Sequence, residues 1–144
     1  MKLTASHKVS RKAGMTLLEL TVVILVLLSL ISILFIGARA WKKGSDRAAS
    51  ILQIRNVQQA VRSYANMNGV NPNTTVATLE TDVFGPGKFI ENNPTANPHP
   101  AGGTYVFTIA APTLVPDIGD LYMETPGGDE PTEFNPKAGS HDDW

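Results

Sequence analysis

One carboxylate lies inside an otherwise uncharged, apolar segment near the start of the chain. The segment, residues 15–38, contains 24 residues, and Glu19 is the only charged one among them. Because a charge is costly to place in a bilayer, an acid there is a candidate for a proton-relay or substrate-binding residue. Four helical steps put Glu19 about 6 Å from Met15, so a position near the membrane surface is the simpler alternative. These residues alone leave both alternatives open.

The rest of the chain offers few groups for catalysis. It has no cysteine, which excludes disulfides, zinc thiolate sites and cysteine nucleophiles. A zinc site needs three or four converging ligands, and the two histidines of the later chain, His99 and His141, are far apart in sequence. The sequence contains no recognisable nucleophile–base pair, P-loop or dinucleotide-binding fingerprint. We therefore expect no enzymatic activity.

Acidic residues gather in the turn-rich second half of the chain. Calcium takes six to eight oxygen ligands, commonly from such loops. We identify four candidate ligands: Asp117, Asp120, Glu124 and Asp129. The simpler alternative is a solvated acidic surface, and the sequence predicts no other cofactor.

Charge is distributed unevenly along this chain of 144 residues, whose net charge is -1. Residues 1–14 carry four basic residues and no acid, and residues 39–62 carry six basic residues against one aspartate. Residues 68–144 carry eleven acids against two lysines. This acidic second half disfavours nucleic-acid binding, because nucleic acids are themselves anionic. The asymmetry also predicts electrostatic complementarity between copies of the chain.

The apolar segment is long enough to span a bilayer as a helix of about 36 Å. A secretory signal peptide has a shorter apolar region, about 7–15 residues, followed by a cleavage site. Residues 38–50 instead continue the helical pattern. Basic residues flank both ends of the segment, so the positive-inside rule does not orient it. Hydropathy alone indicates an uncleaved signal anchor that tethers a domain to the membrane.

The sequence GMTLLEL, residues 14–20, resembles the cleavage-and-methylation motif of type IV pilins and type II secretion pseudopilins, which typically reads GFTLIEL. Five residues match the motif: Gly14, Thr16, Leu17, Glu19 and Leu20. Met15 replaces the usual phenylalanine, and Leu18 replaces isoleucine. The motif is specific because it combines a short basic leader, a glycine, a glutamate five residues later and an uninterrupted apolar span.

This resemblance implies a processing route. Prepilin peptidase is expected to cut between Gly14 and Met15 on the cytoplasmic side and to methylate the new amine of Met15. The leader, residues 1–14, is then lost and the apolar helix is retained. The resemblance also implies a single-pass protein of the bacterial inner membrane, with its N-terminus in the cytoplasm and its C-terminal domain outside.

The resemblance further implies a structural role. The chain is expected to be a subunit of a homo-oligomeric helical filament, a type II secretion pseudopilus or a type IV pilus, built with an inner-membrane assembly platform and minor pilins or pseudopilins. Thr16 and Glu19 are expected to act in assembly, with Glu19 of one copy meeting the Met15 amine of its neighbour. The order of the later elements resembles the major pseudopilins, which bind calcium in a C-terminal loop. The alternative from another class is a membrane-tethered binding or enzymatic domain on an uncleaved anchor.

The expected fold class is α+β, the type IV pilin fold, with a long N-terminal helix and a small antiparallel sheet packed on it. The expected divisions are a leader (1–14), a transmembrane or filament-core helix (15–38), an amphipathic continuation (39–67), a small α+β head (68–124) and an acidic, flexible tail (125–144). The helix is expected to end at Asn68-Gly69, because glycine readily leaves the helical conformation. Six residues fall within roughly 140° of a helical wheel and form an apolar stripe: Ile51, Ile54, Val57, Val61, Tyr64 and Ala65.

Shorter elements are expected to cover this stripe. A short helix is predicted within residues 74–84, capped by Thr74 or Thr75. The proline-rich stretch that follows is a predicted loop, with Phe89 and Ile90 directed into the core. Three short strands are predicted, at residues 104–110, 113–116 and 120–124.

Overall fold

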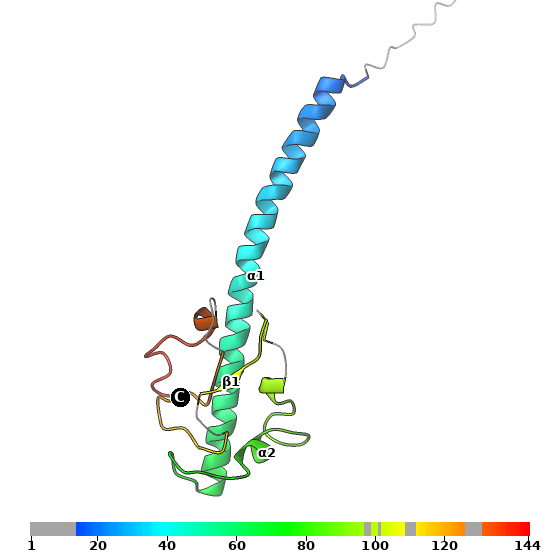
Figure 1. Cartoon of the computed structure of the whole chain (residues 1–144). Helices are drawn as coiled ribbons and strands as arrows, with labels where there is room; N and C mark the ends of the chain where they lie inside the picture. The colour runs from blue at the N-terminus through cyan, green and yellow to red at the C-terminus, as the bar shows by residue number, and fades with distance from the viewer. Residues whose placement is uncertain (1–13, 97–98, 101, 109–111, 126–130) are drawn as a thin grey trace, which may run out of the picture. The chain divides into compact units, whose positions relative to one another are not determined.

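The computed structural model describes residues 14–96, 99–100, 102–108, 112–125 and 131–144. Internal contacts divide the chain into two units, Met1–Arg39 and Ala40–Trp144. Helix α1, Leu17–Asn68, contributes its first part to one unit and its second part to the other. Figure 1 shows this helix and the shorter elements that follow it in the chain.

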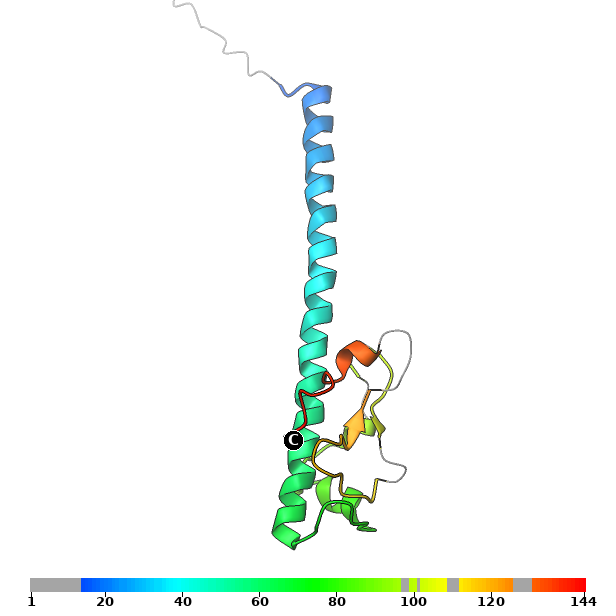
Figure 2. The ribbon, with the colours of Figure 1, turned by 90° about the vertical axis from the view of Figure 1, so that its left-hand side faces the viewer.

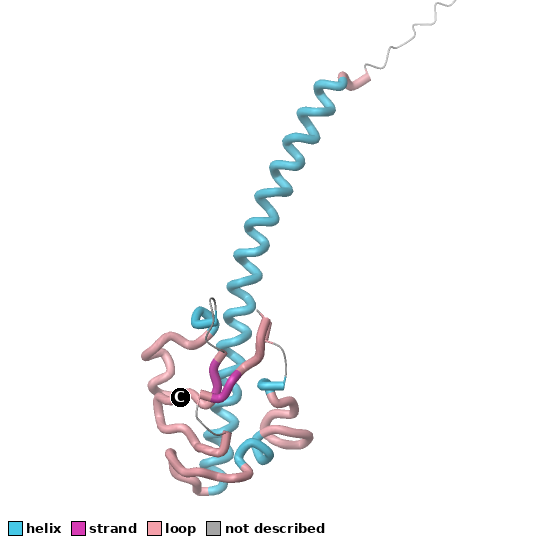
Figure 3. Tube along the Cα trace, viewed as in Figure 1, coloured by secondary structure: helices cyan, strands magenta, loops and turns pink. Residues whose placement is uncertain are grey.

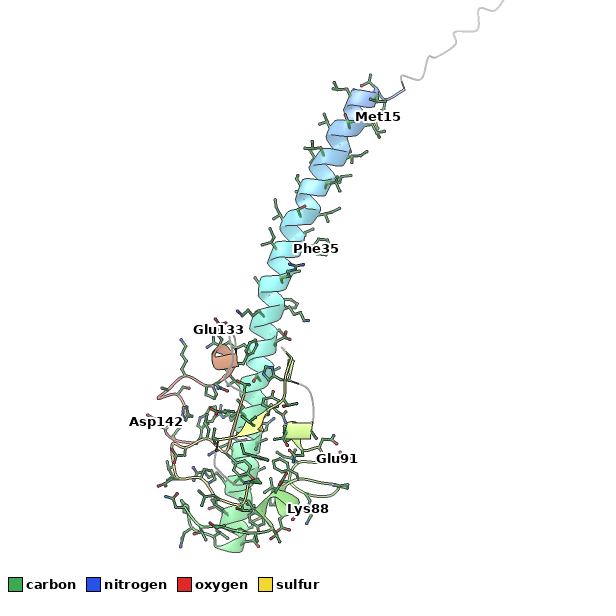
Figure 4. The ribbon with its side chains drawn as sticks, in the orientation of Figure 1. Met15, Phe35, Lys88, Glu91, Glu133 and Asp142 are labelled. Carbon is green, nitrogen blue, oxygen red and sulfur yellow. The ribbon has the colours of Figure 1, made fainter. Side chains whose placement is uncertain are left out.

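The first part of α1 is apolar and exposed on all sides. Every large apolar side chain between Met15 and Ile36 is at least 47% exposed, and Figure 4 shows side chains projecting around the helix from Met15 to Phe35. By its length and composition, this helix can cross a membrane. No proline precedes Pro72, so no residue forces a break. The predicted helix is confirmed, although it begins at Leu17 and not at Met15.

The second part of α1 supplies one wall of the core of the unit Ala40–Trp144. Its large apolar side chains recur every three or four residues and are buried: Ile54, Val57, Val61 and Tyr64. Residues from the later chain close the core: Leu79, Val83, Val115, Tyr122 and Met123 are all fully buried. Burying one aliphatic side chain contributes about 1.5–3 kcal/mol. The predicted apolar stripe is confirmed, with Ile51 half-buried at its edge.

Helix α1 ends where the sequence predicts. Gly69 follows the last helical residue, Asn68, and has a φ of 64°. Side chains disfavour this left-handed conformation, which glycine adopts readily. The main-chain N–H of Val70 donates to the carbonyl of Ala65 at 2.8 Å, which satisfies one of the last helical carbonyls.

The elements after α1 are short. In chain order they are α2 (Leu79–Val83), η1 (Pro94–Ala96), β1 (Val106–Phe107), β2 (Met123–Glu124) and η2 (Pro131–Phe134). The two strands pair antiparallel, with Val106 opposite Glu124 and Phe107 opposite Met123. Figure 3 shows that the sheet is small and that most of the later chain is loop. In Figure 2, both strands and α2 lie on the same side of the second part of α1.

The short helix α2 begins later than predicted. It follows Thr78, so the prediction that Thr74 or Thr75 caps it is wrong. Thr75 instead forms an isolated antiparallel bridge with Leu114. A residue in such a bridge has an extended backbone, so the helix cannot begin before it.

The sheet is also smaller than predicted. Each strand has two residues, and the strand candidate 113–116 contributes only the bridge at Leu114. Residues 109–111, the end of the first candidate, lie outside the described residues. Phe89 is 42% exposed, and of the two loop residues expected in the core only Ile90 packs partly against it. The prediction for Phe89 is therefore wrong.

The end of the chain is more closely packed than a flexible tail. Phe134 is buried, and Trp144 packs against the core. The side-chain oxygen of Asn135 accepts hydrogen bonds from the main-chain N–H and the hydroxyl of Thr125, each at 2.8 Å. Composition alone misses these contacts, because a few well-placed residues can hold a segment that is otherwise polar.

Candidate functional site

Helix α1 begins with a capping box made by Thr16 and Glu19. The main-chain N–H of Thr16 donates to Oε2 of Glu19 at 2.8 Å, and the Thr16 hydroxyl donates to the same oxygen at 3.0 Å. In return, the main-chain N–H of Glu19 donates to Oγ1 of Thr16 at 3.3 Å. This reciprocal pattern satisfies two N–H groups that have no partner within the helix. The two residues assigned to assembly are therefore in direct contact within one copy.

The residues just before the capping box are accessible. Gly14 and Met15 lie outside α1, and Met15 is 68% exposed. A Cβ atom added to Gly14 would meet no atom of the described chain within 4 Å. No contact within the described chain requires glycine here, so a requirement for it has to come from another molecule.

The predicted calcium ligands do not form a cluster in the part of the chain that the structure describes. Among those residues, no group of three or more acidic or histidine side chains is placed to hold a metal ion. Asp117 instead accepts a hydrogen bond from Nδ2 of Asn73 at 3.0 Å. Glu124 is half-buried on β2, and Asp129 lies outside the described residues. Calcium binding therefore stays a prediction.

A buried polar pair joins α1 to the loop before β1. Nε2 of His99 lies 2.8 Å from Oγ of Ser50, and the two residues are 5% and 0% exposed. The rings of Tyr105 and Phe134 enclose the imidazole edge-on, with centroids 5.0 and 5.1 Å away. Burial lowers the pKa of His99, and the charge of Asp46 opposes this effect to a smaller extent. Burial therefore favours the neutral form of the imidazole.

This pair has the spacing of a nucleophile and its base but lacks access. A serine nucleophile has to be reached by its substrate. Ser50 is fully buried and His99 is only 5% exposed, so neither side chain is open to a substrate. We therefore assign Ser50 and His99 to packing between α1 and the loop.

A second buried polar side chain sets the register of the later chain on α1. Gln58 is 1% exposed. Its Nε2 donates to the carbonyl of Asp120 at 2.8 Å, and its Oε1 accepts from the main-chain N–H of Tyr122 at 2.9 Å. The side-chain amide thus binds the segment before β2 in the way that a neighbouring strand would.

Sequence reasoning missed Ser50, Gln58 and His99 as structural residues. A signal was present for two of them, because Ser50 and Gln58 lie four residues to either side of Ile54 and so share the buried face of the helix. A polar side chain at such a position needs a hydrogen-bond partner. His99 gives no such signal, because it lies in a loop without periodicity.

Comparison of the chain with protein-family models, with curated proteins and with solved structures finds no match.

Proposed function

We propose that this protein is a pilin or pseudopilin, a structural subunit of a helical filament. It is made as a single-pass inner-membrane protein, cleaved between Gly14 and Met15 by prepilin peptidase, and polymerised into a type II secretion pseudopilus or a type IV pilus. The observation that carries this proposal is the exposed apolar part of α1, which begins directly after Gly14–Met15 with the Thr16–Glu19 capping box.

The apolar part of α1 requires a cover. Its large side chains are exposed along the whole stretch from Met15 to Ile36, and exposed apolar surface costs about 25 cal/mol per Å² in water. A helix that is apolar on all sides suits either a bilayer or the centre of a bundle of like helices. This property supports a subunit that first resides in the membrane and then enters a filament core.

The bilayer and the filament core differ most in the cost that they impose on the charge of Glu19. Near the lipid headgroups its carboxylate costs less than the roughly 2.5–3.5 kcal/mol of a charge at the centre of the bilayer. In a bundle core without water, an unpaired carboxylate or ammonium is costly, and two such groups brought together remove each other's cost. We assign the Met15 amine of a neighbouring processed copy as the partner of Glu19. Such a pair forms only when the two helices dock in the correct axial register.

The capping box gives the same carboxylate a second role within one copy, and substitutions separate the two roles. Glutamine at position 19 can still accept the Thr16 N–H, since glutamine serves as well as glutamate in a capping box. It carries no charge, so it cannot neutralise an amine. Glu19→Ala removes both functions, and Thr16→Ala weakens only the cap, by about 1 kcal/mol.

The test compares these three variants in cells that assemble the filament. We expect all three to be cleaved normally, as measured by mass spectrometry of the mature chain. Glu19→Gln should lose filaments in electron micrographs as completely as Glu19→Ala, whereas Thr16→Ala should lose fewer. Normal filaments from Glu19→Gln would assign the carboxylate to capping alone and overturn the pairing.

The same mass spectrum tests the proposal against a membrane-tethered domain on an uncleaved anchor. Loss of residues 1–14 and a methylated Met15 support the filament subunit. An intact Met1 in the membrane-bound protein would contradict it and favour the tethered domain.

A further inference from the structure

A groove of about 630 Å³ lies between the second part of α1 and the end of the chain. We call it the Trp144 groove, and its lining includes Arg55, Gln59, Arg62, Ser63, Ile118 and Trp144. Asp143 is the one acidic residue among those that line it. The groove therefore combines two guanidinium groups with exposed apolar surface, since Ile118 is 66% exposed.

Both guanidinium groups are held in place. Arg62 donates from one terminal nitrogen to the main-chain oxygens of Asp117 and Trp144, each at 2.7 Å. Its Nε is buried and has no hydrogen-bond partner among the residues that the structure describes. Arg55 lies over the ring of Trp144, 5.2 Å from the centroid, in a cation–π contact. Arg62 is already bound by main-chain oxygens and Asp143 offsets part of the positive charge. Arg55 has no ion pair with a carboxylate among the described residues, so it is the cation that the groove offers to a partner.

The opposite flank of the unit Ala40–Trp144 carries complementary groups. We call residues 88–91 the Phe89 loop. Phe89 is 42% exposed, and Glu91 is exposed without an ion pair among the described residues. Lys88 is already close to a carboxylate, because its Nζ lies 3.7 Å from Asp82. The loop therefore presents one aromatic ring and one free negative charge.

These two surfaces flank the same exposed ridge of α1. Gln59 and Ser63 line the Trp144 groove on one side and, on the other, a second pocket that Phe89 also lines. Figure 4 shows Asp142, near the groove, on one flank and Lys88 and Glu91 on the other. Because the Trp144 groove and the Phe89 loop lie on different sides of one molecule, they cannot contact each other within it. They can contact each other between two copies.

We propose that the Trp144 groove of one copy binds the Phe89 loop of a second copy. Glu91 faces Arg55, and Phe89 packs against Ile118 and Trp144. Because the contact joins two different surfaces, it is heterologous and can propagate from copy to copy without closing. The inference rests on the proposed function and deepens it, since it names a lateral contact between subunits that is separate from the Glu19 pair.

The chain has no cysteine, so engineered cysteines report this contact without background. Gln59→Cys lies in the groove and Asn92→Cys lies beside Glu91, and both positions are exposed. The two full-length variants, with different epitope tags, are co-expressed in cells and oxidised in the membrane and in filaments. We expect a mixed disulfide dimer that contains both tags, and no dimer from either variant alone. Homodimers without the mixed species would overturn the proposal.

Charge reversal tests the pairing itself. Arg55→Glu in the Gln59→Cys copy should lower the yield of mixed dimer about tenfold, which corresponds to roughly 1.4 kcal/mol. Adding Glu91→Arg to the Asn92→Cys copy should restore it. Arg47→Glu, a reversal on α1 outside the groove, is the matched control and should leave the yield unchanged. Equal losses from Arg55→Glu and Arg47→Glu, or no rescue by Glu91→Arg, would contradict the Arg55–Glu91 contact.

Electron microscopy of the same cells separates this inference from the proposed function. Filaments without the mixed dimer overturn the lateral contact and leave the filament role intact. The mixed dimer without filaments supports the contact and contradicts the filament role.

Discussion

At the scale of single residues, His99 is a titratable side chain buried in the core. It is enclosed by Ser50, Tyr105 and Phe134, and its pKa is lowered by burial. The unfolded chain has an ordinary histidine pKa of about 6.5, so between that value and the lower folded pKa the unfolded state binds more protons. The free energy of unfolding therefore falls as the pH falls through this window.

We predict that this loss of stability depends on His99. The full chain in detergent micelles should show a lower melting temperature at pH 5.5 than at pH 7.5. His99→Gln keeps a polar group for Ser50 but cannot titrate, so its melting temperature should differ less between the two pH values. His141 lies in an exposed contact with the Lys137 carbonyl, and His141→Gln serves as the control. An unchanged pH dependence in His99→Gln would show that another group is responsible.

At the scale of elements, the two parts of α1 lie in different surroundings. Its first part is exposed and apolar, whereas its second part is one wall of a core. Gln58 and Ser50 interrupt the apolar face of the second part and bind the main chain and a side chain of the later segments. Because these polar contacts are directional, they select one register where apolar packing would tolerate several.

Gln58→Ala should therefore destabilise the contact of β2 with α1. The change leaves the buried main-chain N–H of Tyr122 without its partner, which costs about 1–3 kcal/mol. Gln59 is exposed one position away, so Gln59→Ala is the matched control and should change the stability by no more than about 0.5 kcal/mol. Urea unfolding of the full chain in micelles measures both. Equal stability of the two variants would remove the assigned role of Gln58.

The start of α1 carries a separate prediction, on processing. Since the described chain leaves open space around Gly14, Gly14→Val should not disturb the folded chain. It should block cleavage, because a peptidase that acts at this bond requires an unhindered backbone. An immunoblot of membranes should then show accumulation of the full-length precursor. Normal amounts of the mature form would place the cleavage site elsewhere.

At the scale of the whole molecule, charge separates basic α1 from acidic later segments. Apart from Asp46, every acid of the unit Ala40–Trp144 lies outside α1. Among the described residues of this unit, ion pairs join Lys43 to Glu133 at 2.9 Å and Lys88 to Asp82 at 3.7 Å. Exposed pairs of this kind contribute only about 0–1 kcal/mol each. The other acidic side chains that the structure describes are open to solvent, to cations or to neighbouring copies.

The prediction of calcium binding tests whether a cation compensates some of this acidic charge. If Asp117 and Asp120 take part in a calcium site, millimolar calcium should raise the melting temperature of the full chain and a chelator should reverse the rise, because a ligand that binds only the folded state stabilises it. Asp120→Asn should abolish the effect, while magnesium at the same concentration should not reproduce it. A melting temperature that is indifferent to calcium would leave these acids as a solvated surface.

The sequence by itself determined the helix α1, its apolar first part, its buried stripe and its end at Asn68-Gly69. These features follow from local periodicity, from hydropathy and from the conformational freedom of one glycine. It also identified Thr16 and Glu19 as a pair of interest, but only the tertiary structure joined them in a capping box within one copy.

Only the tertiary structure decided how the later chain covers α1. The bridge between Thr75 and Leu114, the hydrogen bonds of Gln58 and the packing of Trp144 all join residues that are far apart in sequence. Such contacts depend on which loops meet after collapse, and strands of two residues are too short to show a period. For the same reason the Trp144 groove, which is built from α1, from Pro72 and from residues near the end of the chain, has no signature in the sequence.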